Sequence, residues 1–338
     1  MSLWFSLFVV ILLLLIPTAL AGTTGLQALF GIVIPYAAII LFLGGFIYRV
    51  LKWAKSPVPF RIPTTSGQQR SLPWLKSNKF DNPNSTWGIM GRMALEIFLF
   101  RSLFRNTVAE LRGGPKLVYG SSKYLWAAGL AFHYSFLIIF IRHFKYFVEP
   151  IPGWVTLAQN LDGFFQVGLP IIYATDAIIL AAVGYLFLRR IADAKIRYIS
   201  HAADYFPLLL IVAIACTGIL MRYFIKVDLV SVKKLGMGLL SLNPVLPEGI
   251  SSMFYIHLFL VSSLIAYFPF SKLMHLGGVF LSPTRNLANN NRARRHINPW
   301  NYPVKVHTYE EYEHEFHDVM KAAGLPLESS NPTEAGKS

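Results

Sequence analysis

Four histidines lie in long apolar stretches of the sequence, where an imidazole gains nothing from surrounding hydrocarbon. His133 and His143 are ten residues apart in one stretch, and His257 and His275 are eighteen apart in and just beyond the last one. Ionisable groups in membrane-spanning segments are costly and indicate function by default. A lone histidine can simply hydrogen-bond a neighbouring helix, but two on each of two segments indicate pairs of ligands.

The order of the segments predicts how these histidines pair. Two further apolar segments separate the two that carry them, so the two run antiparallel. This brings His133 level with His275 and His143 level with His257. A low-spin b-type haem takes two axial imidazoles in an apolar slot, and helix bundles build such sites from side chains on facing helices. The sequence therefore predicts two bis-histidine haem sites.

The unequal spacing of the histidines needs a break in one helix. At about 1.5 Å per residue, ten residues of helix span roughly 15 Å and eighteen span roughly 27 Å. Straight helices perpendicular to the membrane therefore cannot place the two histidines of both pairs at the same depth. Pro269, between His257 and His275, is expected to bend or break its helix, and helix tilt absorbs part of the remainder.

The elements that must hold these histidines are membrane-spanning helices. Of the 338 residues, 54% are hydrophobic and only 14% are charged, which predicts an integral membrane protein. Continuous apolar runs favour helices over a β-barrel. Six segments are long and apolar enough to cross a hydrocarbon core of about 30 Å. They cover about 3–21, 26–48, 124–147, 167–188, 206–225 and 250–275. The predicted fold is an all-α bundle of six transmembrane helices.

Basic residues predict the orientation of this bundle. The net charge is +14, but it is divided among loops rather than gathered on one face, which argues against nucleic-acid binding. Residues 49–123 hold thirteen Lys or Arg against three acids, whereas Lys145 is the one Lys or Arg in residues 143–168. Because basic loops stay in the cytoplasm, both chain ends and the 49–123 loop are predicted to be cytoplasmic, in the cytoplasmic membrane.

Three parts follow from this pattern: an N-terminal helix at 1–24, a membrane domain at 25–280 and a cytoplasmic tail at 281–338. The first helix could be a cleaved leader, because "TALAG" at 18–22 suits cleavage, but an uncleaved helix is favoured. Outside the spans, residues 88–105 are expected to form a helix at the membrane interface or against a partner. Another helix is expected to begin at Thr308.

The cysteine content limits the cofactors that this chain could bind by itself. Cys216 is the single cysteine. It excludes disulfides, haem attached through C-x-x-C-H, and an iron–sulfur cluster held by four thiolates of this chain.

Three charged residues near the histidines could also take part. Arg142 and Arg222 lie at the predicted outer ends of the third and fifth segments, where guanidinium groups suit haem propionates. Binding to lipid headgroups is the alternative. Asp176 lies inside the fourth segment and could carry protons or orient a ligand histidine. Its alternative is pairing with a neighbouring polar group.

The histidine spacing resembles that of the respiratory nitrate reductase gamma-subunit family, which comprises dihaem cytochromes b that oxidise quinol. The resemblance covers about 25–280, so the last five segments correspond to that family's five helices and the first is an addition. Three stretches are also similar to DsrM, the membrane cytochromes of the DsrMKJOP complexes of sulfate-reducing organisms. They are "WAKSPVPFRIPTTSGQQRSLPW", "LFRSLFRNT" and "LVYGSSKYLWAAGLAFHYSFLIIFIRH".

The resemblance implies a function. Menaquinol would be oxidised beside the outer haem of His143 and His257, and electrons would cross to the inner haem of His133 and His275. They would leave to a cytoplasmic iron–sulfur subunit resembling heterodisulfide reductase, DsrK, in dissimilatory sulfur metabolism, with DsrJ, DsrO and DsrP as further subunits. The family places its quinol pocket beside the distal haem with a lysine nearby. The candidates by position are Lys145, Tyr146, Glu149 and Asp162.

Other functions stay open at this point. The chain could be the cytochrome b of another quinol-linked reductase, of nitrate or heterodisulfide type. It could be a transporter or proton channel that uses His133, His143 and Asp176 as a relay. A cofactor-free membrane anchor is a third reading.

Overall fold

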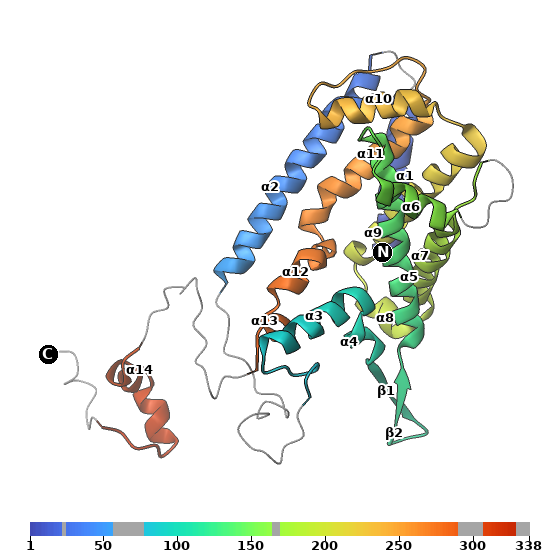
Figure 1. Cartoon of the computed structure of the whole chain (residues 1–338). Helices are drawn as coiled ribbons and strands as arrows, with labels where there is room; N and C mark the ends of the chain where they lie inside the picture. The colour runs from blue at the N-terminus through green and yellow to red at the C-terminus, as the bar shows by residue number, and fades with distance from the viewer. Residues whose placement is uncertain (22–24, 57–77, 164–169, 290–306, 329–338) are drawn as a thin grey trace.

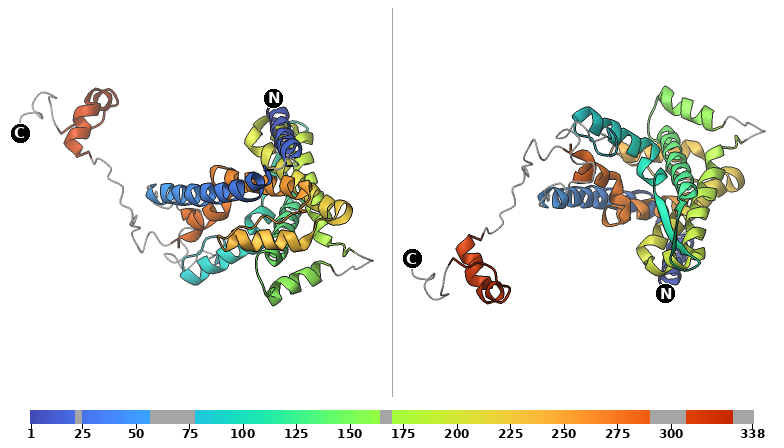
Figure 2. Two further views of the ribbon diagram at one scale, coloured as in Figure 1. Left: turned by 90° about the horizontal axis from the view of Figure 1, so that it is seen from above. Right: turned by 90° about the horizontal axis from the view of Figure 1, so that it is seen from below.

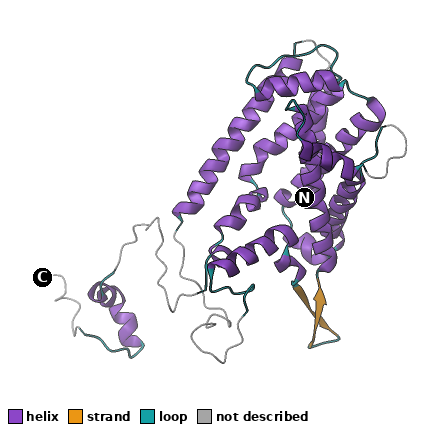
Figure 3. Cartoon of the chain, in the orientation of Figure 1, coloured by secondary structure: helices purple, strands orange, loops and turns teal. Residues whose placement is uncertain are grey.

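The computed structural model describes residues 1–21, 25–56, 78–163, 170–289 and 307–328. Within these ranges the chain is almost entirely helical, with one two-stranded β-hairpin (Figures 1 and 3). The long helices lie side by side in one bundle, and α14 (Tyr309–Ala322) lies apart from it.

Five helices in the described ranges are long and apolar enough to cross a membrane. They are α1 (Ser2–Leu20), α2 (Ile34–Lys55) with the π-helical turn η1 (Leu29–Val33), α5 (Lys123–His143) with η2 (Phe144–Tyr146), α9 (Ala202–Leu220) with η3 (Met221–Ile225), and α11 (Ser252–Tyr267) with η4 (Phe268–Phe270). These helices match five of the six predicted segments.

The predicted fourth segment corresponds to α7 (Ala174–Ala192), a helix of 19 residues. Asp176 lies in its first turn and Arg189 and Arg190 in its last, so α7 is less uniformly apolar than the other five. At about 1.5 Å per residue it is roughly 28 Å long, close to the thickness of a hydrocarbon core. Its crossing of the membrane stays a prediction.

The bundle has its own apolar core. α5 packs against α7, α7 against α9, and α9 against α11, while α1 lies across α9 and α11 and α2 runs along α11 (Figure 2, from above and below). Val10, Val183, Leu210 and Leu260 meet in the core and are at most 4% exposed. The outer faces expose many large apolar side chains, such as Ile40 at 69%, as expected for a surface in lipid.

The last helix is broken, as its proline predicts. α11 ends at Tyr267 and is followed by two 3₁₀ turns, η4 and η5 (Lys272–Met274), and then by α12 (His275–Leu281). Pro269 lies in η4 and is fully buried. Because proline lacks an N–H and clashes with the preceding turn, it cannot continue α11. His275 therefore begins a separate helix whose position is independent of the axis of α11.

The shorter elements gather at the two ends of the bundle (Figure 1). At the end where α11 begins lie α6 (Gly153–Asp162) and α10 (Leu229–Leu240). At the opposite end lie α3 (Thr86–Leu99), α4 (Arg101–Phe104), α8 (Ala194–Ile199), α13 (Pro283–Asn286) and the antiparallel hairpin of β1 (Thr107–Arg112) and β2 (Lys116–Ser121). The first end corresponds to the predicted outer face, and the second to the predicted cytoplasmic face.

The two helices predicted outside the spans are present. The helix in 88–105 is divided at Phe100, whose left-handed backbone (φ 48°) ends α3. α14 begins after Thr308, where Thr308 and Glu311 form a reciprocal capping box. The sequence analysis missed α6, α10 and the hairpin.

An ion-pair cluster stabilises the predicted cytoplasmic end of the bundle. Asp81 forms ion pairs with Arg101 and Arg105 and also accepts a hydrogen bond from Asn78. Burial alone would raise the pKa of Asp81, but the hydrogen bonds from the two guanidinium groups outweigh it and lower that pKa to about 2. The segment before α3 is thereby tied to α4, beside the start of α5.

Gly45 and Gly44 provide a test of the packing at the proline break. A Cβ at Gly45 would lie 2.8 Å from Pro269 Cβ and 2.9 Å from Phe270 Cζ, whereas one at Gly44 would meet nothing within 4 Å. We expect Gly45→Ala to destabilise the protein by about 1–3 kcal/mol through overpacking. Gly44→Ala should be neutral or stabilising, because alanine favours helix by about 1 kcal/mol. Thermal unfolding of both variants in detergent measures the difference, and equal midpoints would contradict a close α2–η4 contact.

Candidate functional site

The structure brings His133 and His275 together at the predicted inner end. Their ring centroids are 5.8 Å apart and the rings are nearly perpendicular, at 82°. Two imidazoles that bind one metal ion from opposite sides, at a metal–nitrogen distance of about 2 Å, place their ring centres roughly 6 Å apart. Phe100 and Phe132 pack edge-on against His133, with centroid distances of 4.9 and 5.0 Å, and supply apolar walls.

His143 and His257 lie at the opposite end of the bundle. His143 ends α5, and His257 lies in the second turn of α11. Both positions therefore lie at the end of the bundle where α11 begins (Figure 1). The His143 side chain is exposed in the structure.

Hydrogen bonds set the tautomer of three of these rings directly. The Nδ1–H group donates to a backbone carbonyl in each case: His133 to Gly129 (2.7 Å), His143 to Ile139 (2.7 Å) and His275 to Lys272 (2.9 Å). Because a carbonyl only accepts, Nδ1 carries the proton, and Nε2 keeps its lone pair. Second hydrogen bonds of this kind fix the orientation of metal-ligating histidines.

His257 reaches the same state through a threonine. Its Nδ1 lies 2.9 Å from Thr217 Oγ1, and that hydroxyl lies 2.9 Å from the carbonyl oxygen of Ala213. The Thr217 O–H donates to the carbonyl, so its oxygen accepts from the Nδ1–H of His257. Gly218 lets α9 approach the ring, because a Cβ there would lie 3.3 Å from His257 Cε1.

The donor set therefore fits two haems. In the described part of the chain, none of the four Nε2 atoms has a hydrogen-bond partner, and no group of three or more His, Cys, Asp or Glu could hold a metal ion. The histidines lie at two levels of an apolar bundle, with His133 beside His275 at one end and His143 and His257 at the other. A haem b with two axial histidines is held by neutral imidazoles in such surroundings.

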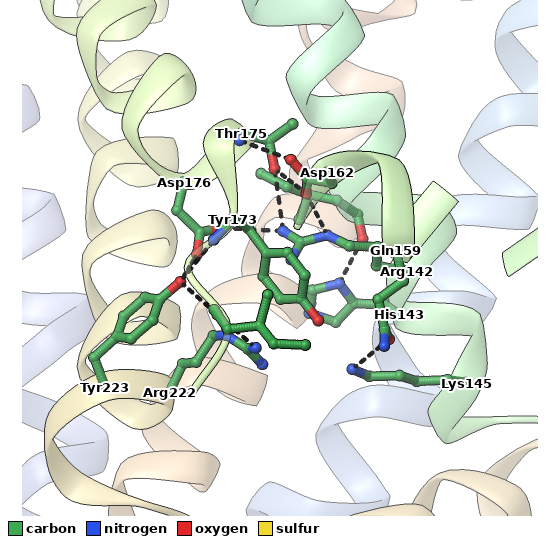
Figure 4. Close-up of polar contacts among 12 residues, drawn as sticks. Arg142, His143, Lys145, Gln159, Asp162, Tyr173, Thr175, Asp176, Arg222 and Tyr223 are labelled. Atoms are coloured by element: carbon green, nitrogen blue, oxygen red, sulfur yellow. Dashed lines mark hydrogen bonds and ion pairs between the residues drawn. The ribbon is translucent and has the colours of Figure 1, made fainter. Parts of the chain in front are cut away.

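A polar network lies next to His143 (Figure 4). Arg142 is 6% exposed. Its Nε lies 3.0 Å from Asp162 Oδ2, and one terminal nitrogen lies 3.1 Å from Asp176 Oδ1. Tyr223 donates its hydroxyl to Asp176 Oδ2 at 2.8 Å. Arg142 was a candidate to bind a haem propionate, but its guanidinium group already contacts two carboxylates. Asp176 pairs with neighbouring polar groups, which was the alternative to a proton-carrying role.

Arg222 lies on the other side of this network. It donates from Nε and a terminal nitrogen to the carbonyl of Ile171, at 3.2 and 2.8 Å. Both Arg222 and Arg142 lie over the Tyr173 ring, with Cζ–centroid distances of 4.0 and 3.7 Å. Among the residues described, Arg222 forms no ion pair, so its charge is available to an anionic group.

The four quinol-site candidates separate in the structure. Lys145 donates to Gln159 Oε1 at 3.2 Å, and the Tyr146 ring lies 5.9 Å from that of His143. Glu149 instead forms an ion pair with Lys233 of α10, and Asp162 belongs to the polar network. Lys145 and Tyr146 thus lie beside the outer histidine, whereas Glu149 and Asp162 have other partners.

Sequence reasoning missed Gln159. Its position three residues before the candidate Asp162 could have indicated it, because residues at i and i+3 lie on the same face of a helix. That signal depends on recognising α6, whose ten residues are too few to span a membrane. Tyr173 and Tyr223 carried no distinguishing pattern in the sequence.

Comparisons with known proteins assign the class of this bundle. The nitrate reductase gamma subunit family matches residues 84–295, a range that includes all four histidines. The Hdr-like menaquinol oxidoreductase cytochrome b-like subunit of Archaeoglobus fulgidus is 46% identical over 279 residues, which cover 80% of this chain and 83% of that protein. The subunit of the same name from Archaeoglobus profundus is 42% identical over 274 residues, covering 79% and 81%.

The fold and paired histidines define a multi-helical membrane cytochrome b. The chain belongs to the nitrate reductase gamma subunit family. Membership of a cytochrome b family implies haem as the cofactor.

Thr217 provides a test of the outer ligand geometry. Thr217→Val keeps the shape of the side chain but removes the acceptor for His257 Nδ1–H. Loss of such a partner typically weakens metal-site affinity about tenfold to hundredfold, so we expect partial loss of bound haem by pyridine haemochrome. Thr217→Ser keeps the hydroxyl and should retain both. Equal haem content in the two variants would show that Thr217 does not orient His257.

Proposed function

We propose that this chain is the dihaem cytochrome b subunit of a menaquinol oxidoreductase. His143 and His257 would hold the outer haem, and His133 and His275 the inner one. The observation that carries the proposal is the shared state of the four rings, each with Nδ1 hydrogen-bonded and Nε2 unengaged in the described ranges. His133 lies beside His275, and His143 and His257 lie at the other end of the bundle.

The relatives support the substrate and the partner. Both are named as cytochrome b-like subunits of Hdr-like menaquinol oxidoreductases. A heterodisulfide-reductase-like partner carries iron–sulfur clusters, and with one cysteine this chain cannot supply their thiolates. The electron acceptor is therefore another polypeptide. We further propose that the chain is of the DsrM type, with DsrK as its cytoplasmic acceptor and DsrJ, DsrO and DsrP as further subunits in sulfite-reducing metabolism.

The residues beside His143 suit quinol oxidation. When bound, the haems supply one-electron transfer across the membrane. Lys145 presents an ammonium that can hold a quinol oxygen and stabilise the developing quinolate. Gln159 fixes its position, and Tyr146 lies against His143. Each menaquinol loses two electrons and two protons, and the protons leave to the outer solution.

Two more residues have proposed roles at this end. Arg222 would bind a haem propionate, because it forms no ion pair in the described ranges and lies beside the outer pair. Asp176 is the candidate proton carrier. It accepts a hydrogen bond from the Tyr223 hydroxyl, and part of its side chain is exposed.

The charge pattern supports the orientation. Lys52 and Lys55 end α2, and Arg189 and Arg190 end α7. Both helix ends lie at the end of the bundle that carries α3 and the hairpin (Figure 1). By the positive-inside rule we propose that this end and both termini are cytoplasmic, in the cytoplasmic membrane, with α7 as the sixth span.

The transporter reading finds less support. A relay through Asp176 would need that carboxylate to lie on one path with His133 and His143. Asp176 instead lies 3.1 Å from a guanidinium nitrogen of Arg142, and His133 faces His275.

The ligand pairing is tested by single substitutions. His143→Ala and His257→Ala should each remove the same haem and leave the other, because each haem loses one of two axial ligands. His133→Ala should remove the second haem. Pyridine haemochrome and a reduced-minus-oxidised spectrum measure both. A protein without a b-type band would exclude the proposal, and loss of one common haem in His143→Ala and His133→Ala would contradict the pairing.

Lys145 tests the location of quinol oxidation. We expect Lys145→Ala to slow haem reduction by a menaquinol analogue by roughly tenfold or more, as loss of one charge-stabilising donor does, with haem content and spectra unchanged. Lys55→Ala, at the far end of α2, is the matched control and should react normally. Normal reduction of the Lys145 variant would remove that residue from the site, and a slow Lys55 variant would move the pocket to the other face.

A further inference from the structure

Asp162 joins α6 to α7 and to the end of α5. Its carboxylate accepts hydrogen bonds from the Thr175 backbone N–H (2.9 Å) and hydroxyl (2.7 Å), and its Oδ2 lies 3.0 Å from Arg142 Nε. The side chain is 1% exposed. A carboxylate at a helix N-terminus is stabilised by free N–H groups and the helix dipole. Here the cap of α7 comes from another helix.

Arg142 is held in place by this arrangement. Its guanidinium contacts Asp162, Asp176 and Thr175, and it lies over the Tyr173 ring. Moving it would leave both carboxylates without a cationic partner, which is unfavourable in a protein interior. Arg142 directly precedes His143 in the last turn of α5. Fixing the arginine therefore fixes the turn that presents the histidine.

The network also places balanced charge beside His143. Arg142 and Arg222 contribute two positive charges, and Asp162 and Asp176 contribute two negative ones, so the formal sum is zero. Charges in a low-dielectric interior act more strongly and are screened less than charges in water. Removing one member should change the electrostatic potential at His143 in the direction opposite to the sign of the charge removed.

We propose that Arg142 and Asp162 are positioning residues that orient His143 and set the reduction potential of the outer haem. The pair takes no part in quinol binding. This inference rests on the proposed function, since it requires a redox group at His143. It assigns Asp162 a role different from that of Lys145 and Tyr146.

The test is a redox titration of the full chain carrying both haems. Asp162→Asn leaves an uncompensated cation and should raise the midpoint potential of the outer haem. Arg142→Gln leaves excess negative charge and should lower it. The charge-neutral double variant should return toward the original potential, because the two changes cancel, and the inner haem should not shift. A purely structural role would not follow the sign of the charge removed.

Asp228→Asn is the matched control. Asp228 also caps a helix, accepting from the N–H groups of Val230 and Ser231 at the start of α10, but it is exposed. It should leave the outer potential unchanged. If the midpoint potential of the outer haem shifted as much in this variant as in Asp162→Asn, the effect would come from long-range charge and not from the network. That result would overturn the inference.

The remaining outcomes separate the two proposals. Absence of haem from the unmodified chain refutes the proposed function itself. Two bound haems with outer potentials that do not change in any variant refute this inference alone. If a single variant loses the outer haem, the double variant should regain it, and a double variant that stays without it overturns the role of the Arg142–Asp162 pair.

Discussion

The cost of an unpaired polar group in hydrocarbon constrains this whole bundle. Water is absent from the membrane interior, so each imidazole must satisfy its N–H within the protein. Three rings donate to carbonyls of a preceding turn, and His257 donates to Thr217. Each ring is thereby left with one lone pair, on Nε2. The hydrogen bond that each Nδ1–H must make therefore also leaves Nε2 free to bind a metal ion.

The side chains that surround the histidines differ between the two ends of the bundle. Aromatic rings surround the inner pair, with Phe100 and Phe132 against His133. Around the outer pair lie two guanidinium groups, two carboxylates and the Lys145 ammonium. An apolar end suits a site that passes electrons alone. Under the proposed function, the charged end suits a site where quinol also loses protons.

Irregular backbone lies where the sites require it. The 3₁₀ turns around Pro269 detach α12 from α11, so that His275 can meet His133 although eighteen residues separate it from His257. The π-helical turn η3 carries Arg222 and Tyr223, and both reach toward the segment before α7. Such turns inside helices often occur at functional sites. Regular helices alone would not bring these side chains to their partners.

Much of the membrane architecture could be read from the sequence. The spans, the pairing of His133 with His275, the break at Pro269 and the cap at Thr308 all follow from patterns local in the chain: hydropathy, spacing, proline and capping residues. A span of about twenty apolar residues has few alternative conformations in lipid. These features therefore needed little knowledge of neighbouring segments.

The tertiary structure alone decided which charged groups meet. Arg142 pairs with Asp162 and Asp176, which lie twenty and thirty-four residues further along the chain, and Glu149 pairs with Lys233. From the sequence, Arg142 was a candidate to bind a haem propionate and Asp162 a candidate for the quinol site, because both follow or precede His143 closely in the chain. Ion pairs form between side chains that folding brings within a few ångströms, and sequence position does not determine that distance once α6 folds back over the end of α5.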